Sequence, residues 1–255
     1  METAKMDIKK LNQQFKESSL TEVLTFVFDA FKNNVVLASS LGLEDQLLTH
    51  YSMQVTKNAR VFMIDTGRLN QETYNVMEKT RNKYKFNYEV YYPDTHSVET
   101  LLRKKGPNSF YESVKNRKEC CAIRKTEPLN RLLASADAWI TGVRNAQGVT
   151  RTDMALFEED NAHNCIKINP LIKWSHNEVF AEIKRLKIPY NTLHDQGYPS
   201  IGCAPCTRAI KPGEDIRAGR WWWESPENKE CGLHIVDGKI VSKMQKNNNQ
   251  KGLQS

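Results

Sequence analysis

Short apolar segments alternate with amphipathic helical segments along most of the chain, and this alternation limits the fold more than any other feature of the sequence. The segments with the length and apolar character of buried strands are 35–39, 60–65, 88–92, 138–143 and 165–168. The segments with apolar residues at helical spacing are 1–32, 44–51, 70–84 and 177–187. Because strands that alternate with helices pair in parallel, we predict an α/β fold, an open and mostly parallel sheet flanked by helices.

The composition suits a single packed domain. The chain has 255 residues, of which 39% are hydrophobic and 26% charged, enough to form a core. It shows neither an apolar run of membrane-spanning length nor a secretory signal, so we expect a cytoplasmic protein without a membrane partner. We assign the domain to residues 1–243 and expect residues 244–255 to be a disordered tail. The net charge of +7 favours an anionic ligand such as a nucleotide, phosphate, sulfate or nucleic acid.

Four of the six cysteines form two close pairs, Cys120 with Cys121 and Cys203 with Cys206. In a long chain that is low in cysteine and expected in the cytoplasm, this pattern favours metal binding or catalysis over disulfides. A Cys-x-x-Cys turn can direct two thiolates at one centre, whereas adjacent cysteines do so only where the local backbone allows it. The two pairs together predict a four-thiolate site, either an iron–sulfur cluster or a zinc ion, with a redox Cys-x-x-Cys as the third alternative.

The two remaining cysteines have different surroundings. Cys165 lies in a short apolar segment and is expected to be a buried structural thiol. Cys231 stands alone, with Lys229 and His234 nearby, and has no partner in the sequence. Lone cysteines near a chain end are often incidental, but basic surroundings lower the pKa of a thiol. Cys231 is therefore a candidate nucleophile.

Small and polar residues follow three of the predicted strands. Ligands of open parallel sheets bind at the carboxyl ends of the strands, where these residues are expected to meet. The candidate ligands are Ser39, Ser40 and Gly42 after the first strand, Asp65 and Thr66 after the second, and Gly142 and Arg144 after the later one. The loops match neither a Walker A sequence nor Gly-x-Gly-x-x-Gly, so they predict a nucleotide site of another type.

Basic residues gather in two other segments. Residues 101–125 hold eight lysines and arginines, including Lys125, against two acidic residues. This segment is either a solvated helical surface or the positive rim of an anion site, and the first cysteine pair inside it favours the rim. Arg217 and Arg220 are three residues apart, so they either share one face toward an anion or form surface charge beside a tryptophan cluster.

Seven segments of the chain match a known family in the family's order. They are SSLGLEDQ, IDTGRLNQETY, KECCAIRKTEPL, ITGVRNAQGVTR, IGCAPCTR, AGRWWWE and KECGLH. On these motifs the chain resembles the assimilatory sulfonucleotide reductases, and most closely the iron–sulfur type, the adenylyl-sulfate (APS) reductases. The match extends from Ser39 to His234, and the paired cysteines with the terminal ECGLH are its most specific part.

The resemblance implies an adenine-nucleotide α-hydrolase-like fold and the reduction of APS to sulfite and AMP. It makes Cys231 the catalytic cysteine, which lies on a mobile C-terminal segment and forms an S-sulfocysteine intermediate. The residues implied to hold a [4Fe–4S] cluster are Cys120, Cys121, Cys203 and Cys206. The residues that match the family's substrate-facing cations are Lys125, Arg144, Arg217 and Arg220.

The resemblance also implies a protein partner, and it favours one function over the alternatives. The thioredoxin-like domain of plant-type members does not follow in the sequence, so we expect thioredoxin or glutaredoxin as an external reductant. The paired cysteines favour APS over its 3′-phosphorylated form, PAPS, and a PAPS reductase or dual-specificity enzyme is the alternative. An ATP-pyrophosphatase-type enzyme on the same fold is a further alternative. Enzymes of that type have a pyrophosphate loop with a second glycine, which SSLGLED lacks. The last alternative is a non-catalytic module that binds zinc or nucleic acid. We favour the enzyme and therefore expect no nucleic-acid partner. The sequence leaves open whether the protein forms a homo-oligomer.

Overall fold

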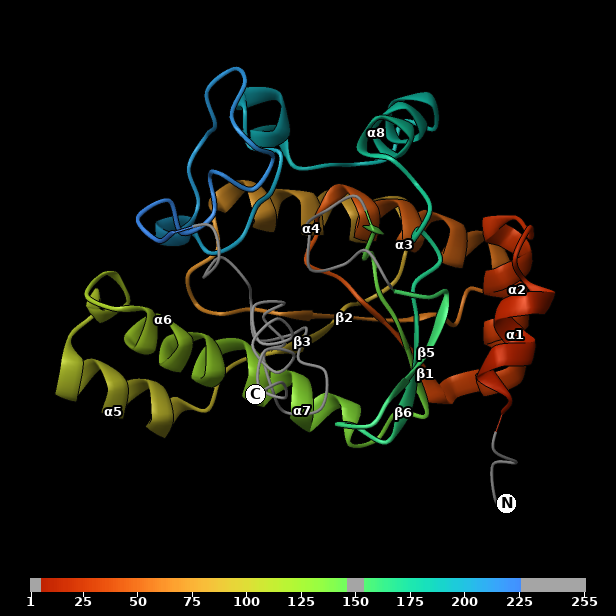
Figure 1. Cartoon of the computed structure of the whole chain (residues 1–255), viewed down its shortest axis with the longest axis horizontal. Helices are drawn as coiled ribbons and strands as arrows, with labels where there is room; N and C mark the ends of the chain where they lie inside the picture. Colours follow the sequence, from red (N-terminus) through yellow and green to blue (C-terminus); the bar gives the residue numbers. More distant parts are fainter. Residues whose placement is uncertain (1–5, 146–153, 226–255) are drawn as a thin grey trace, which may run out of the picture.

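Six strands form one sheet in the computed structural model, which describes residues 6–145 and 154–225 (Figure 1). The strands are β1 (Val35–Ala38), β2 (Arg60–Ile64), β3 (Glu89–Tyr91), β4 (Ala138–Ile140), β5 (Phe157–Asp160) and β6 (Cys165–Ile168). Their order across the sheet is β3-β2-β1-β4-β6-β5. All neighbours are parallel except β5, which pairs antiparallel with β6. The predicted open, mostly parallel sheet is thereby confirmed.

Helices cover both faces of the sheet (Figure 1). They are α1 (Ile8–Gln14), α2 (Leu20–Phe31), α3 (Leu43–Val55), α4 (Gln71–Tyr84), α5 (Thr95–Lys105), α6 (Val114–Cys121), α7 (Glu127–Leu133) and α8 (His176–Arg185). In Figure 1, α3, α4 and α8 lie above the sheet and α5, α6 and α7 below it. Within the described part of the chain, no helix is long and apolar enough to cross a membrane.

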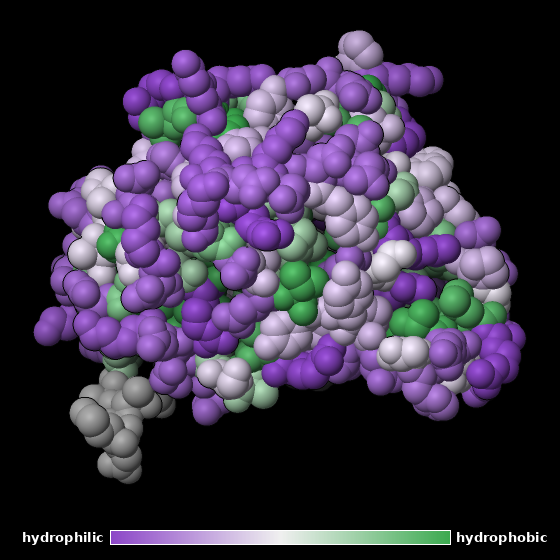
Figure 2. Space-filling view, turned by 180° about the vertical axis from the view of Figure 1, so that it is seen from behind, coloured by the Kyte–Doolittle hydropathy of each residue, from purple (hydrophilic) through white to green (hydrophobic). Residues whose placement is uncertain are grey.

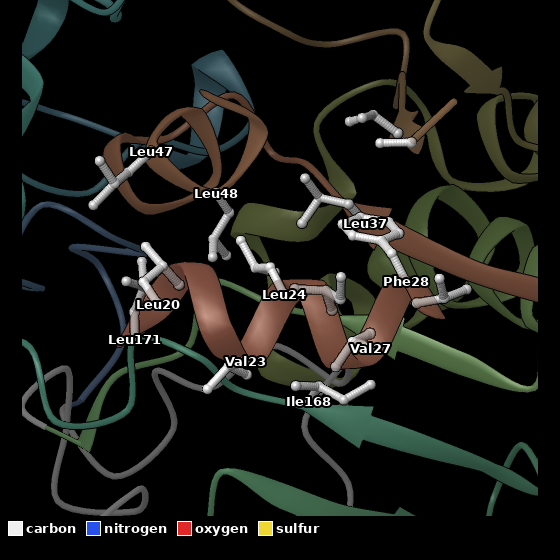
Figure 3. Close-up of a cluster of buried hydrophobic side chains, with 14 of the residues drawn as sticks. Leu20, Val23, Leu24, Val27, Phe28, Leu37, Leu47, Leu48, Ile168 and Leu171 are labelled. Atoms are coloured by element: carbon white, nitrogen blue, oxygen red, sulfur yellow. The ribbon is translucent and has the colours of Figure 1, made fainter. Parts of the chain in front are cut away.

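The core has two parts because successive strand residues point to opposite faces of the sheet. Leu37 of β1 packs against α2 and α3 on one face, where Leu24 and Leu48 are fully buried (Figure 3). Val36, its neighbour in the strand, packs on the other face against α7, together with Leu132. Both faces of β1 are therefore apolar, as expected for a central strand of a parallel sheet.

The N-terminal segment expected to be helical, residues 1–32, contains two helices. Among the described residues, α1 and α2 are separate. Ser19 begins α2 with a capping box: its hydroxyl accepts from the backbone of Glu22, whose carboxylate accepts from the backbone of Ser19. Capping of this kind starts a new helix even where apolar spacing continues across the break. A capping box of the same kind, formed by Ser175 and Glu178, begins α8.

Strand β5 was not predicted from the sequence. Its sequence, FEED, has one apolar residue and three acidic ones, so it lacks the apolar character of the other strands. It lies at the edge of the sheet, where charged residues can face solvent.

The surface on the side opposite to that of Figure 1 is mostly hydrophilic, with small hydrophobic groups between polar side chains (Figure 2).

Candidate active site

A pocket of about 290 Å³ opens at the carboxyl ends of β1, β2 and β4. Its walls come from the loops after these strands and from residues 194–220. Of the ten residues predicted to bind a nucleotide, nine line this pocket: Ser39, Ser40, Gly42, Thr66, Lys125, Gly142, Arg144, Arg217 and Arg220. The apolar side chains of Phe62, Leu129 and Trp139 form another part of the wall. The pocket therefore combines a polar, cationic side with an apolar side.

The loop after β1 is built around Asp45, a buried carboxylate in the first turn of α3. Ser40 donates to Asp45 Oδ2 from its backbone N–H at 2.7 Å and from its hydroxyl at 2.6 Å. A Cβ atom at Gly142 would lie 2.3 Å from Asp45 Oδ1, so glycine is required where the β4 loop meets this carboxylate. Burial raises the pKa of Asp45 to about 6, against the opposing effect of the Ser40 hydrogen bonds.

Arg144 lies in the pocket wall but is already paired. Its Nε donates to Glu44 Oε1 at 2.8 Å, and its side chain is 2% exposed. Its Nη1 also donates to the carbonyl oxygen of Trp174 at 3.4 Å. The Glu44 carboxylate offsets the Arg144 charge, so this pair presents less net positive charge to an anion than the sequence suggested.

Asp65 is the one predicted ligand that does not line the pocket. It is buried, and its carboxylate accepts from the backbone N–H of Gly67 at 2.8 Å and from the Tyr74 hydroxyl at 3.0 and 3.1 Å. These bonds close the turn between β2 and α4. Burial, with a contribution from Asp65, raises the pKa of Tyr74 to about 12, so the phenol keeps its donor proton.

Arg220 supplies a buried cation to the pocket. Its Nη1 donates to the Ser200 hydroxyl and to the Ile201 carbonyl oxygen, both at 3.3 Å, and its guanidinium lies 4.8 Å from the ring centre of Trp221. Among the described residues, no carboxylate pairs with Arg220, and its Nε has no hydrogen-bond partner. Arg217 and Lys125 line the same pocket. Such a set of cations suits a ligand with several anionic oxygens.

A second, smaller cavity brings the two cysteine pairs together. Cys120, Cys121, Cys203 and Cys206 all line it, although up to 86 positions separate them in sequence. The cations Arg68, Arg117, Arg124 and Lys125 line it as well. Lys125 and Cys203 also line the larger pocket, so the two cavities share a wall.

Local backbone features direct each cysteine pair toward this cavity. A π-helical stretch over Ala122–Thr126 follows α6 directly, so it begins next to the adjacent cysteines. Such widened turns re-aim side chains within a helix and are frequent at functional sites. The second pair lies on a short 3₁₀ turn, Ala204–Cys206, which the backbone bond from Ala204 N–H to the carbonyl oxygen of Arg68 (2.8 Å) ties to the loop after β2. Thr66 Oγ1 lies 3.2 Å from Cys203 Sγ.

Burial and the neighbouring charges act in opposite directions on the cavity thiols. Burial raises the pKa of Cys206 to about 12 and also raises the pKa of Cys120. Arg124 and Lys125 oppose these shifts, because a cation favours the thiolate. A bound metal centre would deprotonate thiol ligands outright, and the surrounding cations would offset the charge of four thiolates.

The residues of this cavity fit an iron–sulfur cluster in ligand chemistry. Four thiols, cations around them and donors such as the Thr66 hydroxyl match what holds and tunes such clusters. In the part of the chain that the structure describes, no three His, Cys, Asp or Glu side chains converge closely enough to hold a single metal ion.

Several residues of the site were not predicted. Glu44 and Asp45 belong to the segment expected to be helical over residues 44–51, yet both line the pocket. Arg117 was one of several basic residues expected on a surface or rim, but it is 1% exposed. The signal for Asp45 was its place in SSLGLEDQ beside the Ser40 hydroxyl; no local signal marks Arg117 as buried.

The two cysteines outside the pairs are Cys165 and Cys231. Cys165 is buried in β6 as expected, and burial raises its pKa to about 12. The predicted nucleophile, Cys231, lies outside the described residues. So does the predicted boundary between domain and tail near residue 243. Their assignments stay predictions.

Comparison with known proteins places this site in a family context. Residues 34–209 match the family model described as phosphoadenosine phosphosulfate reductase domain. The chain is 50% identical over 204 residues to the adenosine 5′-phosphosulfate reductase of Burkholderia cepacia, with 80% of this chain and 82% of that protein covered. It is 48% identical to the adenosine 5′-phosphosulfate reductase of Allochromatium vinosum, with 86% of this chain and 85% of that protein covered.

Solved structures share the architecture. The phosphoadenylyl-sulfate (PAPS) reductase from Candida auris, solved as a phosphate complex, superposes with a TM-score of 0.70 at 28% identity and covers 82% of this chain and 99% of its own. The FMN adenylyltransferase of Candida glabrata with FMN and an ATP analogue superposes with a TM-score of 0.52 at 15% identity, covering 92% of this chain and 77% of its own. The latter likeness concerns the fold alone, and it agrees with the predicted adenine-nucleotide α-hydrolase-like fold.

Proposed function

Because the chain belongs to the phosphoadenosine phosphosulfate reductase domain family, we propose that it reduces APS to sulfite and AMP in sulfate assimilation, with electrons from an external dithiol. It is an oxidoreductase that acts on a sulfur group. Relatives at 48–50% identity that carry the name adenosine 5′-phosphosulfate reductase support APS as the substrate.

One observation carries the proposal beyond family membership: the nucleotide-sized pocket and the four-thiol cavity share a wall formed by Lys125 and Cys203. The apolar side of the pocket, with Phe62 and Trp139, suits a flat base. The cationic side, with Arg220, suits the phosphosulfate. In this arrangement the anionic end of the substrate faces the wall next to the thiols.

The chemistry we propose starts at Cys231. Its thiolate forms a bond to the sulfur of APS, the bond from that sulfur to the phosphate oxygen breaks, and the electron pair leaves with AMP. The product is S-sulfocysteine on Cys231. Arg217, Arg220 and Lys125 offset the charge that develops on the AMP phosphate, because preorganised cations stabilise a leaving group as its charge grows.

A thioredoxin or glutaredoxin dithiol completes the reaction. Its first thiolate attacks Sγ of Cys231, sulfite leaves, and a mixed disulfide forms; its second thiol resolves that disulfide. The dithiol thereby supplies both electrons and ends as a disulfide. Reducing partners of this kind keep thiols reduced in the cytoplasm, where we place the protein.

We assign the [4Fe–4S] cluster to Cys120, Cys121, Cys203 and Cys206 on the fit of these residues. When bound, it would act on the neighbouring substrate pocket through structure and electrostatics, without the need to change its oxidation state. Lys125 faces both cavities, so it can hold a substrate oxygen while it compensates thiolate charge.

The assay for this proposal measures AMP and sulfite from APS with thioredoxin, together with mass spectrometry of the protein after APS alone. The wild type should release both products, and the adduct should map to Cys231. Cys231→Ser should retain the cluster but form no adduct, and the control Cys165→Ala should retain both. Wild-type protein with a full cluster that releases no AMP, or an adduct mapped to Cys165, would contradict the proposal.

PAPS is the second candidate substrate, and one observation favours it: the C. auris structure with a TM-score of 0.70 is a PAPS reductase. APS and PAPS differ by the phosphate on the ribose, so kcat/KM for both with the same thioredoxin decides between them. We expect a higher kcat/KM for APS. A ratio that favours PAPS would reassign the substrate and leave the chemistry at Cys231 unchanged.

A further inference from the structure

A buried ion pair joins two segments of the four-thiol cavity that are far apart in sequence. Arg117 Nε donates to Glu224 Oε1 at 2.9 Å and Arg117 Nη2 donates to Glu224 Oε2 at 2.7 Å. The two side chains are 1% and 3% exposed. Two parallel bonds of this kind fix the relative orientation of both partners as well as their distance.

Each partner is tied to one cysteine pair. Arg117 lies on α6, three residues and so about one turn before Cys120. Glu224 lies shortly after Arg220, which forms an isolated bridge with Thr207, the residue directly after Cys206. The backbone N–H of Trp221 also donates to the carbonyl oxygen of Cys206 at 3.2 Å. The ion pair thus connects the helix of the first cysteine pair to the hydrogen-bonded partner of the second.

Trp221 extends this connection to the substrate pocket. The Arg117 guanidinium lies 4.6 Å from the ring centre of Trp221, and the Arg220 guanidinium lies 4.8 Å from the same ring. The indole is 1% exposed, so both stacking contacts are desolvated. Arg220 has no carboxylate partner among the described residues, and its place in the pocket wall depends on this ring and on the Ser200 and Ile201 oxygens.

We propose that Arg117 and Glu224 are positioning residues: their ion pair holds the two cysteine pairs at the spacing that one cluster needs and, through Trp221, holds Arg220 toward the phosphosulfate. The inference rests on the proposed cluster and substrate. A buried ion pair contributes little net stability compared with apolar residues of the same size, because desolvation opposes the attraction. Its bidentate geometry, however, specifies one arrangement of the two segments.

The experiment compares Glu224→Gln with the matched control Glu214→Gln. Glu214 forms a bidentate pair with Arg208, at 2.9 and 3.0 Å, in the loop just after Cys206, but that pair joins residues of one loop and not the two cysteine pairs. Glu224→Asp keeps the carboxylate and can still pair with Arg117, so it serves as the conservative variant. Each protein is purified anaerobically and measured for iron and sulfide, visible absorption, KM for APS, kcat and thermal unfolding.

We expect Glu224→Gln to lose at least half of its iron, to change the visible spectrum of the remainder and to raise KM for APS at least tenfold. Glu214→Gln should match the wild type in all of these, and Glu224→Asp should recover most of the iron and of the KM. If Glu224→Gln is insoluble, the comparison rests on Glu224→Asp and on the exchanged pair Arg117→Glu with Glu224→Arg, which should regain iron that Arg117→Glu alone lacks.

Two results would overturn the inference. One is a Glu224→Gln protein with a lower unfolding temperature but wild-type iron content, spectrum and KM, which is what a merely stabilising pair would give. The other is an exchanged pair with no more iron than Arg117→Glu alone. Wild-type protein without iron would instead contradict the proposed cofactor, so the two failures are distinguishable.

Discussion

The backbone of Gly202 lies directly against the guanidinium of Arg220: a Cβ atom at Gly202 would be 2.4 Å from Nη2 and 2.7 Å from Cζ. Gly202 precedes Cys203, so the residue that positions the pocket cation is also next to a thiol of the small cavity. Space rather than backbone freedom requires glycine here, because Gly202 is not among the residues with positive φ.

Gly202→Ala should therefore displace Arg220 and weaken substrate binding. Arg220 cannot remain where it is, since a contact of 2.4 Å is far shorter than van der Waals separation. We expect kcat/KM for APS to fall at least tenfold, about 1.4 kcal/mol of lost transition-state binding. Steady-state kinetics with saturating thioredoxin measure the change.

A double-mutant cycle separates this effect from general damage to the loop. If Gly202→Ala acts through Arg220, it should cost little more in an Arg220→Ala background, because the group that it displaces is already gone. Equal losses in both backgrounds would show that the glycine acts on something other than this cation.

Iron binding should depend on the cysteines that share the small cavity and on no others. Anaerobically purified wild type should contain about four iron and four sulfide per chain. Cys206→Ser should lose most of both, whereas Cys165→Ala should retain them, because Cys165 is a buried thiol of β6 outside the cavity. Stoichiometric zinc without iron in the wild type would refute the cluster.

The sequence predicted the parts of this site that follow from topology. In a parallel sheet, the carboxyl ends of neighbouring strands lie at one edge, so the loops with Ser39 and Gly142 had to meet once the alternation of strands and helices was recognised. The two cysteine pairs already predicted a four-thiolate site from the sequence, but only the family resemblance favoured an iron–sulfur cluster over zinc, because spacing alone does not decide between them.

Contacts between distant segments were beyond sequence reasoning. Arg117 and Glu224 are 107 positions apart, and nothing local distinguishes a buried arginine from its exposed neighbours Lys115 and Lys118. Asp45 was not predicted as a site residue for a different reason. An acidic residue in the first turn of a helix is ordinary, and only the approach of Gly142 makes it a buried carboxylate of the pocket.

The stability of the protein should carry a pH signature from Asp45. An acid whose pKa is raised by folding stabilises the folded state below its unfolded pKa of about 4, and that contribution is lost as the pH rises through about 6. Relative to Asp45→Asn, the wild type should therefore lose stability between pH 4 and pH 7, by at most about 3 kcal/mol. Urea unfolding at several pH values measures the difference.

Glu214→Gln provides a control of opposite sign. The hydrogen bonds from Arg208 lower the pKa of Glu214 to about 2, so its contribution is present above pH 4.5 and is lost as the pH falls toward 2. The Glu214 side chain is 30% exposed, so screening by solvent should keep the effect small. A difference between wild type and Asp45→Asn that does not vary with pH would contradict the assignment of a raised pKa to Asp45.

Turnover should require an external dithiol, and without one each enzyme molecule should release AMP only once. Cys231 has no second cysteine near it in the sequence, and burial raises the pKa of Cys165 to about 12, so Cys165 is not a ready thiolate that could release sulfite from Cys231. With APS alone, we expect one AMP per enzyme and then no more, with the sulfite retained on the protein. Thioredoxin should restore steady turnover, whereas a thioredoxin whose second active-site cysteine is replaced by serine should stop as a mixed disulfide with Cys231. Rapid-quench measurement of AMP, with mass spectrometry of the trapped species, checks both steps. Continued AMP release without any thiol would mean that the sulfur of APS is not transferred to the enzyme.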